Sequence, residues 1–260
     1  MTDFARDRAL EKARYSGYAK QALNSTDADV LGPDGALSIP LELRAPYLVY
    51  EGHIRRLIQP GQKLLDVCCG SGVHSLTGAY GGAHVTCSDI VEANLELARR
   101  RAGRVGLVLD TVIADAEVLP FPSVSLDIVT CAGSLSYVDH GIFFREVKRV
   151  LKPGGYFICV DSLSHNPIYR LNRYLQYLVA KRSKSTLLRM PRHGTVIRMG
   201  EVLGEVAASY HGIFSFASPI IKPILGAKKT ARFLDGLDRM VPILGRHAFK
   251  FVAIARKTAA

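Results

Sequence analysis

The middle of the chain alternates short apolar runs with longer segments in which apolar and charged residues are mixed. The apolar runs predict five buried strands, at Lys63–Cys68, His84–Asp89, Leu107–Ala114, Leu126–Cys131 and Tyr156–Asp161. The mixed segments predict helices at Val73–Tyr80, Val91–Arg101 and Gly141–Leu151. Short buried strands that alternate with helices indicate a parallel sheet covered on both faces. Such sheets bind ligands beyond the carboxyl ends of their strands.

The flanking segments follow a different pattern. Residues 1–30 are polar and predict one or two short helices, and Pro46–Ile58 predicts another. After Asp161 about 45 residues pass before the next strand, a length that usually carries its own helices and a function. Two further strands are expected near Ser209–Phe216 and at His247–Arg256.

We therefore expect one domain over residues 1–260, built from four parts. They are an N-terminal helical cap at 1–60, a sheet core at 61–161, an inserted lid at 162–207 and C-terminal strands of the sheet at 208–260.

Composition places the chain among ordinary globular proteins. Hydrophobic residues make up 48% and charged residues 22% of the sequence. We find neither a membrane-spanning apolar run nor a signal peptide, so a cytoplasmic location is expected. The five cysteines form no CxxC pair, which favours small side chains in a reduced core and no metal site.

The charge is distributed unevenly along the chain. Residues 162–260 hold 17 of the 34 Lys and Arg residues but 4 of the 23 Asp and Glu residues, so their net charge is +13 against −2 for the remainder. This excess indicates an anionic partner on the C-terminal side, or simply a solvated basic face. The helix expected at Pro167–Arg182 is amphipathic, aromatic and basic. It favours a lid over the site, with contact to a membrane surface as the alternative.

A glycine-containing turn follows the first strand. It reads Asp66-Val67-Cys68-Cys69-Gly70-Ser71-Gly72, an acidic residue followed by a pattern in which Cys68 replaces the first of three glycines. Glycine allows positive φ and close approach of a ligand to the backbone. Asp89 ends the second strand, 23 residues after Asp66 and next to Ile90. A carboxylate at this place can accept both hydroxyls of a ribose.

Two further segments narrow the family. Residues 115–121 read Asp-Ala-Glu-Val-Leu-Pro-Phe, and residues 149–155 read Arg-Val-Leu-Lys-Pro-Gly-Gly. Together with the turn and Asp89, they resemble the motifs of class I S-adenosylmethionine (SAM) dependent methyltransferases. The resemblance is greatest to the type 11/25-like bacterial small-molecule group and covers residues 64–160.

The resemblance implies a doubly wound, Rossmann-like sheet with strand order 3-2-1-4-5-7-6, strand 7 being antiparallel. It implies SAM as the cofactor. Asp66 would neutralise the methionine amino group directly or through water, and Asp115 would accept from the adenine amino group. The full set of implied cofactor contacts is Asp66, Cys68, Gly70, Gly72, Asp89, Ile90, Asp115, Ala116, Cys131 and Ala132.

Candidate acceptor residues follow the fourth and fifth strands. Tyr137 and His165 are the candidate catalytic residues, since a hydroxyl nucleophile needs a base. Tyr169, Arg170 and Arg173 are candidate substrate contacts, because the two arginines lie three residues apart and could clamp an anionic group. For His165 and Tyr137 the alternative is an ordinary hydrogen-bonding role, and for the arginines a solvated helix face.

Three functions fit these observations. The first is SAM-dependent methyl transfer to a small acceptor, anionic or carrier-linked, such as a sugar, glycan or secondary metabolite. The second is an RNA or protein methyltransferase that uses the basic C-terminal face, although the chain has no recognisable RNA-binding module. The third is a SAM-binding module without catalysis. The nearly complete motif set favours the first, with peripheral membrane contact as an open alternative and nucleic acid disfavoured as a partner.

Overall fold

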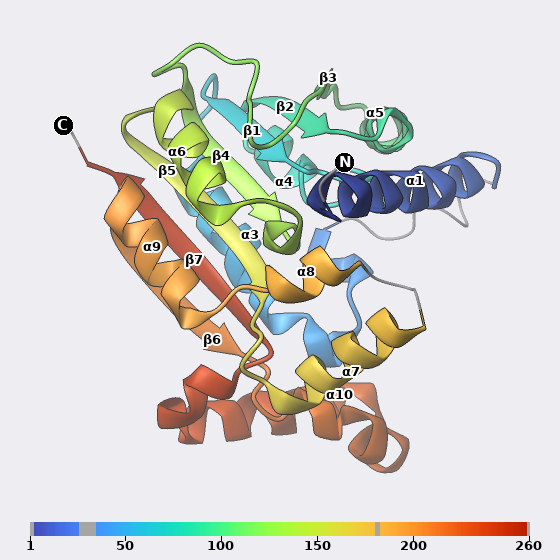
Figure 1. The fold of residues 1–260 in the computed structure, drawn as a ribbon. Helices are drawn as coiled ribbons and strands as arrows, with labels where there is room; N and C mark the ends of the chain where they lie inside the picture. The colour runs from blue at the N-terminus through green and yellow to red at the C-terminus, as the bar shows by residue number, and fades with distance from the viewer. Residues whose placement is uncertain (1–2, 26–34, 180–182, 259–260) are drawn as a thin grey trace.

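The computed structural model describes residues 3–25, 35–179 and 183–258. Its centre is a seven-stranded sheet with the order β3-β2-β1-β4-β5-β7-β6 (Figure 1). The five strands from β3 to β5 are parallel, and β7 is antiparallel to both β5 and β6. This arrangement confirms the predicted fold class and strand order. The strands are β1 (Lys63–Val67), β2 (His84–Asp89), β3 (Asp110–Ile113), β4 (Leu126–Ala132), β5 (Leu151–Ser162), β6 (Gly204–His211) and β7 (Lys250–Lys257).

Helices cover both faces of the sheet and its carboxyl end. The described α-helices are α1 (Asp3–Leu23), α3 (Ala45–Leu57), α4 (Leu76–Tyr80), α5 (Glu92–Arg104), α6 (His140–Val150), α7 (Pro167–Leu178), α8 (Lys184–Leu188), α9 (His193–Leu203) and α10 (Ser218–Met240). The 3-10 helices are η1 (Gly35–Ser38), η2 (Leu41–Leu43), η3 (Leu135–Tyr137), η4 (Ser215–Ala217) and η5 (Pro242–His247). None of the helices in this part of the chain is long and apolar enough to cross a membrane.

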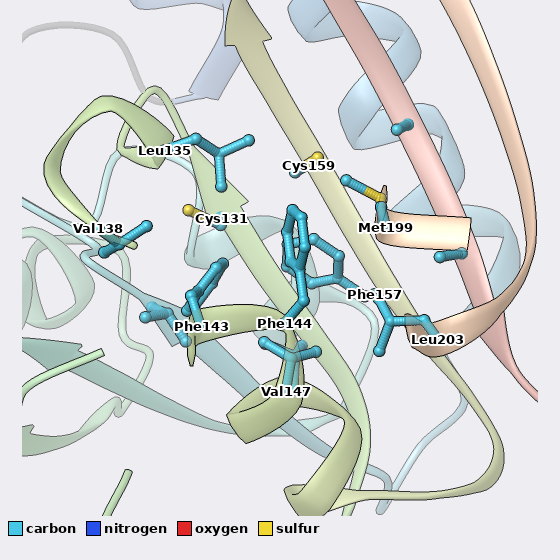
Figure 2. Packing of buried hydrophobic residues seen from close by; sticks show 14 of the residues in the cluster. Cys131, Leu135, Val138, Phe143, Phe144, Val147, Phe157, Cys159, Met199 and Leu203 are labelled. Carbon is cyan, nitrogen blue, oxygen red and sulfur yellow. The ribbon is translucent and has the colours of Figure 1, made fainter. Parts of the chain in front are cut away.

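The largest part of the core lies between the sheet and the α6–α9 layer (Figure 2). Phe143, Phe144 and Val147 of α6 are fully buried and follow the spacing of one helical stripe. They pack on Phe157 of β5, and Met199 of α9 closes the same cluster. On the opposite face α3 packs on β5 and β7, α4 on β2, and α5 on β2 and β3.

The cysteines behave as core side chains. All five are free thiols, and Cys87, Cys131 and Cys159 are buried. Their burial agrees with the prediction of small hydrophobic residues in a core.

The C-terminal part departs most from the sequence-based expectation. β6 begins at Gly204 rather than near Ser209, and the 23-residue helix α10 separates β6 from β7. Pro223 and Gly226 interrupt this helix, and Gly226 has φ 74° and ψ 161°. Proline and glycine are signals for turns, so the sequence pattern did not predict this helix, which these residues kink but do not end. The helix expected at Pro167–Arg182 is α7, whose last predicted residues lie outside the described part, as do residues 26–30 of the N-terminal segment.

Candidate cofactor site

The turn after β1 has the backbone conformation that its glycine pattern predicts. Gly70 and Gly72 have φ values of 54° and 70°. Cys68 also has φ 54°, which few residues other than glycine adopt. Cys68 therefore takes the left-handed conformation at the position where the family pattern has its first glycine. Strained backbone of this kind is concentrated at ligand sites.

A cavity of about 340 Å³ opens beside this turn, beyond the carboxyl ends of β1, β2 and β4. Its volume lies within the range of small-molecule sites. Seven of the ten predicted cofactor contacts line it: Cys68, Gly70, Asp89, Ile90, Asp115, Ala116 and Ala132. The sheet therefore brings together residues from four separate segments of the sequence.

Asp89 forms a buried acidic wall of this cavity. One carboxylate oxygen accepts a hydrogen bond from the Gly70 backbone N–H at 3.0 Å and the other from Val91 N–H at 2.9 Å. Burial raises the pKa of Asp89, and these hydrogen bonds act in the opposite direction. Each carboxylate oxygen can accept a second hydrogen bond, so the group can still receive hydroxyl donors.

Asp66 lies behind the turn rather than in the cavity lining. It is 3% exposed, and it accepts hydrogen bonds from Ser75 Oγ at 2.5 Å and Thr130 Oγ1 at 3.0 Å. Burial raises its pKa. The carboxylate holds β1, β4 and the segment after the turn together, and its contact with the cofactor stays a prediction.

Gly72 and Cys131 are also outside the cavity lining. A Cβ atom on Gly72 would lie 2.7 Å from Ala98 Cβ, so this glycine allows the turn to pack on α5. Cys131 is buried in the α6 core instead. Both residues shape the site through packing, and their predicted contacts with the cofactor stay predictions.

The N-terminal helix supplies a wall that the sequence did not predict. Arg8, Glu11, Lys12 and Tyr15 of α1 line the cavity, and Arg8 pairs with the Asp115 carboxylate. α1 packs on α5 and on α8, which contributes Ser185 and Thr186 to the lining (Figure 1). Pattern analysis could identify the helix but not where it docks.

Two acidic residues of α1 join it to α8. Glu11 accepts a hydrogen bond from Ser183 N–H at 3.0 Å, and Asp7 accepts one from Ser185 N–H at 2.8 Å. These bonds satisfy backbone donors at the start of α8, which have no partner within their own helix. α1 and α8 therefore form one connected cover over the cavity.

Tyr137 also lines the cavity, as part of η3 after β4. Its hydroxyl is 2.7 Å from the hydroxyl of Tyr15, and the two rings meet edge to face. This pair connects the loop after β4 to the α1 cover.

His165 lies outside the cavity lining and is exposed. Its ring centroid is 4.9 Å from that of His193, and its Nε2 atom accepts from His193 N–H at 3.4 Å. Burial and the neighbouring His193 lower the pKa of His165. The structure therefore places the two candidate catalytic residues apart, and only Tyr137 faces the cavity.

The predicted arginine clamp does not form on α7. Arg173 is buried, with its guanidinium 6.0 Å from the Tyr169 ring centroid, whereas Arg170 is exposed. Residues three apart on a helix differ by about 60° in direction. At the edge of a packed face this difference turns one side chain inward and the other to solvent.

A buried cation that the sequence pattern did not predict lies where β5 ends and β7 begins. Lys250 Nζ donates to Ser162 Oγ at 3.1 Å and lies 5.1 Å from the Tyr47 ring centroid. Burial opposes its charge, but Tyr47 and Asp161 outweigh that effect and raise the pKa of Lys250. Within the described residues, no group of three or more His, Cys, Asp or Glu could hold a metal ion.

These features define a class of protein: a doubly wound sheet with a cavity for a nucleoside-containing ligand next to its first strand. Comparison with known proteins narrows the class. Residues 65–159 match the family model described as a methyltransferase domain. This central segment of the chain is therefore similar to a methyltransferase domain.

Sequence similarity to individual relatives covers only part of each chain. A Mycobacterium ulcerans protein named as a phthiotriol/phenolphthiotriol dimycocerosates methyltransferase is 35% identical over 136 residues, which cover 49% of this chain and 52% of the relative. The demethylmenaquinone methyltransferase of Listeria welshimeri is 35% identical over 130 residues, which cover 47% of this chain and 55% of the relative. The chain thus spans about half the length of the curated relatives that it matches.

Among solved structures, the fold is similar to a Haemonchus contortus phosphoethanolamine N-methyltransferase 2 crystallised with S-adenosylhomocysteine. The TM-score is 0.59 at 14% identity, over 82% of this chain and 53% of the other. At this identity the likeness concerns the fold alone.

Proposed function

We propose that the protein transfers a methyl group from SAM to a small, largely apolar acceptor. The observation that carries the proposal is the cavity beside the turn after β1, which brings Gly70, Asp89 and Asp115 to one space. When bound, SAM supplies an electrophilic methyl group. The protein must hold the cofactor, align the acceptor and exclude water.

The lining residues suggest how the cofactor is held. Asp89 would accept the two ribose hydroxyls on its remaining acceptor positions, and Asp115 would accept from the adenine amino group while it keeps its pairing with Arg8. Gly70 lets the backbone approach the ligand, because no atom lies within 4 Å of the place where its Cβ would be. The residues present therefore fit SAM in size and donor chemistry.

The acceptor would enter on the side of Tyr137. The cavity wall is mostly apolar, which favours an acceptor with a large apolar part, and α1 and α8 add polar side chains, among them Arg8 and Lys12, that could contact a polar group on it. The two curated relatives are named for a lipid and a quinone substrate, which supports an acceptor of similar polarity. The basic excess after residue 161 supports an anionic group on that acceptor or on its carrier.

Calorimetry of SAM binding tests the cofactor half of this proposal. Asp89→Ala should weaken binding by about a hundredfold, since it removes two hydrogen bonds to a charged acceptor. Asp110→Ala, which removes an exposed carboxylate from the start of β3, is the matched control and should bind like the wild type. Absence of SAM binding by the wild type would refute the proposal.

Transfer of labelled methyl groups from SAM tests the acceptor half. A panel of demethylated quinones, hydroxylated lipids, phosphorylated sugars and bulk RNA separates the candidate classes. We expect labelling of a quinone or lipid, and labelling of RNA alone would favour the nucleic-acid alternative.

With the true acceptor, Tyr137→Phe should lower kcat/KM by about tenfold, the value of one lost hydrogen bond. His165→Ala should change it by less than about twofold, and the reverse order would restore His165 as the catalytic candidate.

A further inference from the structure

Two helices of the C-terminal half, α7 and α10, carry several large apolar side chains that are exposed to solvent. On α7, Leu171, Leu175 and Leu178 are between 51% and 58% exposed. On α10, Ile220 and Ile224 are 73% and 78% exposed. Single exposed apolar side chains are common on proteins, but groups of them mark interaction sites.

The exposed residues of α7 form one stripe. Leu171, Leu175 and Leu178 are spaced by four and three residues, so they lie on one face of the helix. The buried face is occupied by Arg173 and by Tyr169, whose ring packs edge to face on Phe249. The leucine stripe is therefore left over after the helix has packed on its own domain.

The kink in α10 separates an apolar segment from a basic one. Ile220 and Ile224 precede Gly226, the residue with non-helical angles, and Lys228, Lys229 and Arg232 follow it. All three basic residues are exposed.

The acidic residues of α10 are turned toward the domain. The Asp238 carboxylate accepts hydrogen bonds from the backbone N–H groups of Gly212, Ile213 and Phe214. Asp235 is only partly exposed, and burial raises its pKa. The charge that α10 presents to solvent is consequently basic.

Both helices belong to the same end of the molecule. Asn166, the N-cap residue of α7, donates from its side chain to the His247 carbonyl at 3.1 Å, at the end of η5 that continues from α10. Figure 1 shows α7 and α10 at the end of the sheet where β5 finishes and β7 starts. The cofactor cavity also opens beyond the carboxyl ends of the parallel strands.

We propose that the exposed faces of α7 and α10, here called the α7–α10 surface, dock on an anionic lipid bilayer. Apolar side chains beside exposed lysines and arginines are the composition of helices that lie in a bilayer interface. A second copy of the chain would bring like charges together, and RNA would leave the isoleucines and leucines unmatched. Resting on the proposed function, docking would deliver a membrane-dissolved acceptor to the open end of the domain.

Sedimentation of the full chain with vesicles tests this proposal. We expect binding to phosphatidylglycerol-containing vesicles at low salt, and at least tenfold weaker binding to pure phosphatidylcholine vesicles. Ile220→Ser/Ile224→Ser should lower the partition coefficient on anionic vesicles by about tenfold or more. Val108→Ser is its matched control, since Val108 is 85% exposed and lies just before β3.

The charge requirement is tested separately. Lys228→Glu/Lys229→Glu should lower the partition coefficient by at least twentyfold, because each basic residue near an anionic surface contributes about fivefold. Arg145→Glu/Lys148→Glu changes the same charge at exposed positions of α6 and should bind like the wild type.

Three results would overturn the inference. They are no wild-type binding to anionic vesicles, equal losses in the variants and their controls, or a self-association that Ile220→Ser/Ile224→Ser abolishes. SAM affinity, measured by calorimetry on the same samples, separates the two proposals. A protein that binds SAM but no vesicles contradicts only the docking of the α7–α10 surface on a bilayer. One that binds vesicles but no SAM contradicts only the proposed function.

Discussion

The two walls of the cofactor cavity are built in different ways. The inner wall consists of strand ends and the turn after β1, and its residues follow one another in sequence order between Cys68 and Ala132. The outer wall consists of α1 and α8, which come from opposite ends of the chain. Glu11 contacts Ser183 across 172 residues of sequence. Local patterns can specify the first wall, whereas the second depends on docking between distant helices.

The two walls also differ in what stabilises them. The inner wall rests on side chains that are almost fully buried, such as Leu65, Val129 and Phe157. The cover is held by a small apolar cluster that includes Ala19 and Leu97, and by polar contacts such as the partly exposed pair of Arg8 and Asp115. Partly exposed pairs contribute little each, so the cover should open at much lower free-energy cost than the core. Such an element can admit a cofactor and then enclose it.

The largest expected effect is on the inner wall, at Gly72. Alanine there would need φ near 70° and would place its Cβ 2.7 Å from Ala98 Cβ. Backbone strain and overpacking together should cost about 3 kcal/mol of unfolding free energy, measured by urea denaturation. Gly70→Ala is the matched control, because Gly70 also has a positive φ but no atom lies within 4 Å of its Cβ position. This substitution should lower the free energy of unfolding by about 1 kcal/mol.

A second variant separates the two costs at Gly72. Ala98→Gly in the Gly72→Ala background removes the atom that the new Cβ meets. It should recover stability relative to the sum of the two single substitutions, because the two positions are in contact. Strict additivity would show that the packing of the turn on α5 is not what demands glycine.

The next effect concerns the cover. Glu11→Ala leaves Ser183 N–H without its acceptor and loosens the connection between α1 and α8. We expect SAM to dissociate about fivefold faster, as measured by chase of labelled cofactor, since a buried hydrogen bond contributes about 1 kcal/mol. Lys20→Ala changes an exposed residue of the same helix and should leave the rate unchanged. An unchanged rate in Glu11→Ala would mean that the cover does not control release.

The sequence predicts the part of the site that local patterns specify better than the part that depends on docking between distant helices. Residues at strand ends, such as Asp89 and Asp115, line the cavity because parallel strands bring their carboxyl ends to one edge. Asp66 lies outside the lining, since a carboxylate one residue from a strand end can face the sheet interior as readily as the ligand. Tyr15 could not be predicted as a partner of Tyr137, because the hydrophobic pattern of α1 does not encode the position at which it docks.

The helix boundaries show the same contrast. α6 begins at His140, one residue before the predicted start at Gly141, and Asp139 is the residue that caps it. α10 was missed because its internal Pro223 and Gly226 resemble turn signals, while contacts from distant parts of the chain hold its first segment in place. Glu42 of η2, for example, pairs with Lys222 at 2.8 Å. Locally encoded features were predictable, and those set by distant contacts were not.

The smallest effect tests local encoding at Asp139. Its side chain accepts hydrogen bonds from the backbone N–H groups of Gly141 and Ile142 at 2.9 and 3.0 Å. Asp139→Ala should lower the free energy of unfolding by about 1 kcal/mol near neutral pH, the usual value of an N-cap. Glu201→Ala, at an exposed position of α9, should have no measurable effect.

The pH dependence of this difference identifies its origin. The hydrogen bonds from Ile142 and Gly141 lower the pKa of Asp139 below its ordinary value of 3.8. A carboxyl group whose folded-state pKa is lowered stabilises the fold above its unfolded pKa and loses that contribution as pH falls through the folded value. The difference between wild type and Asp139→Ala should therefore be constant from about pH 8 to pH 5 and shrink below about pH 4. A difference that stays constant below that pH would mean that the side chain acts through packing rather than through its charge. The helix start would then depend on its tertiary surroundings in the same way as the cover.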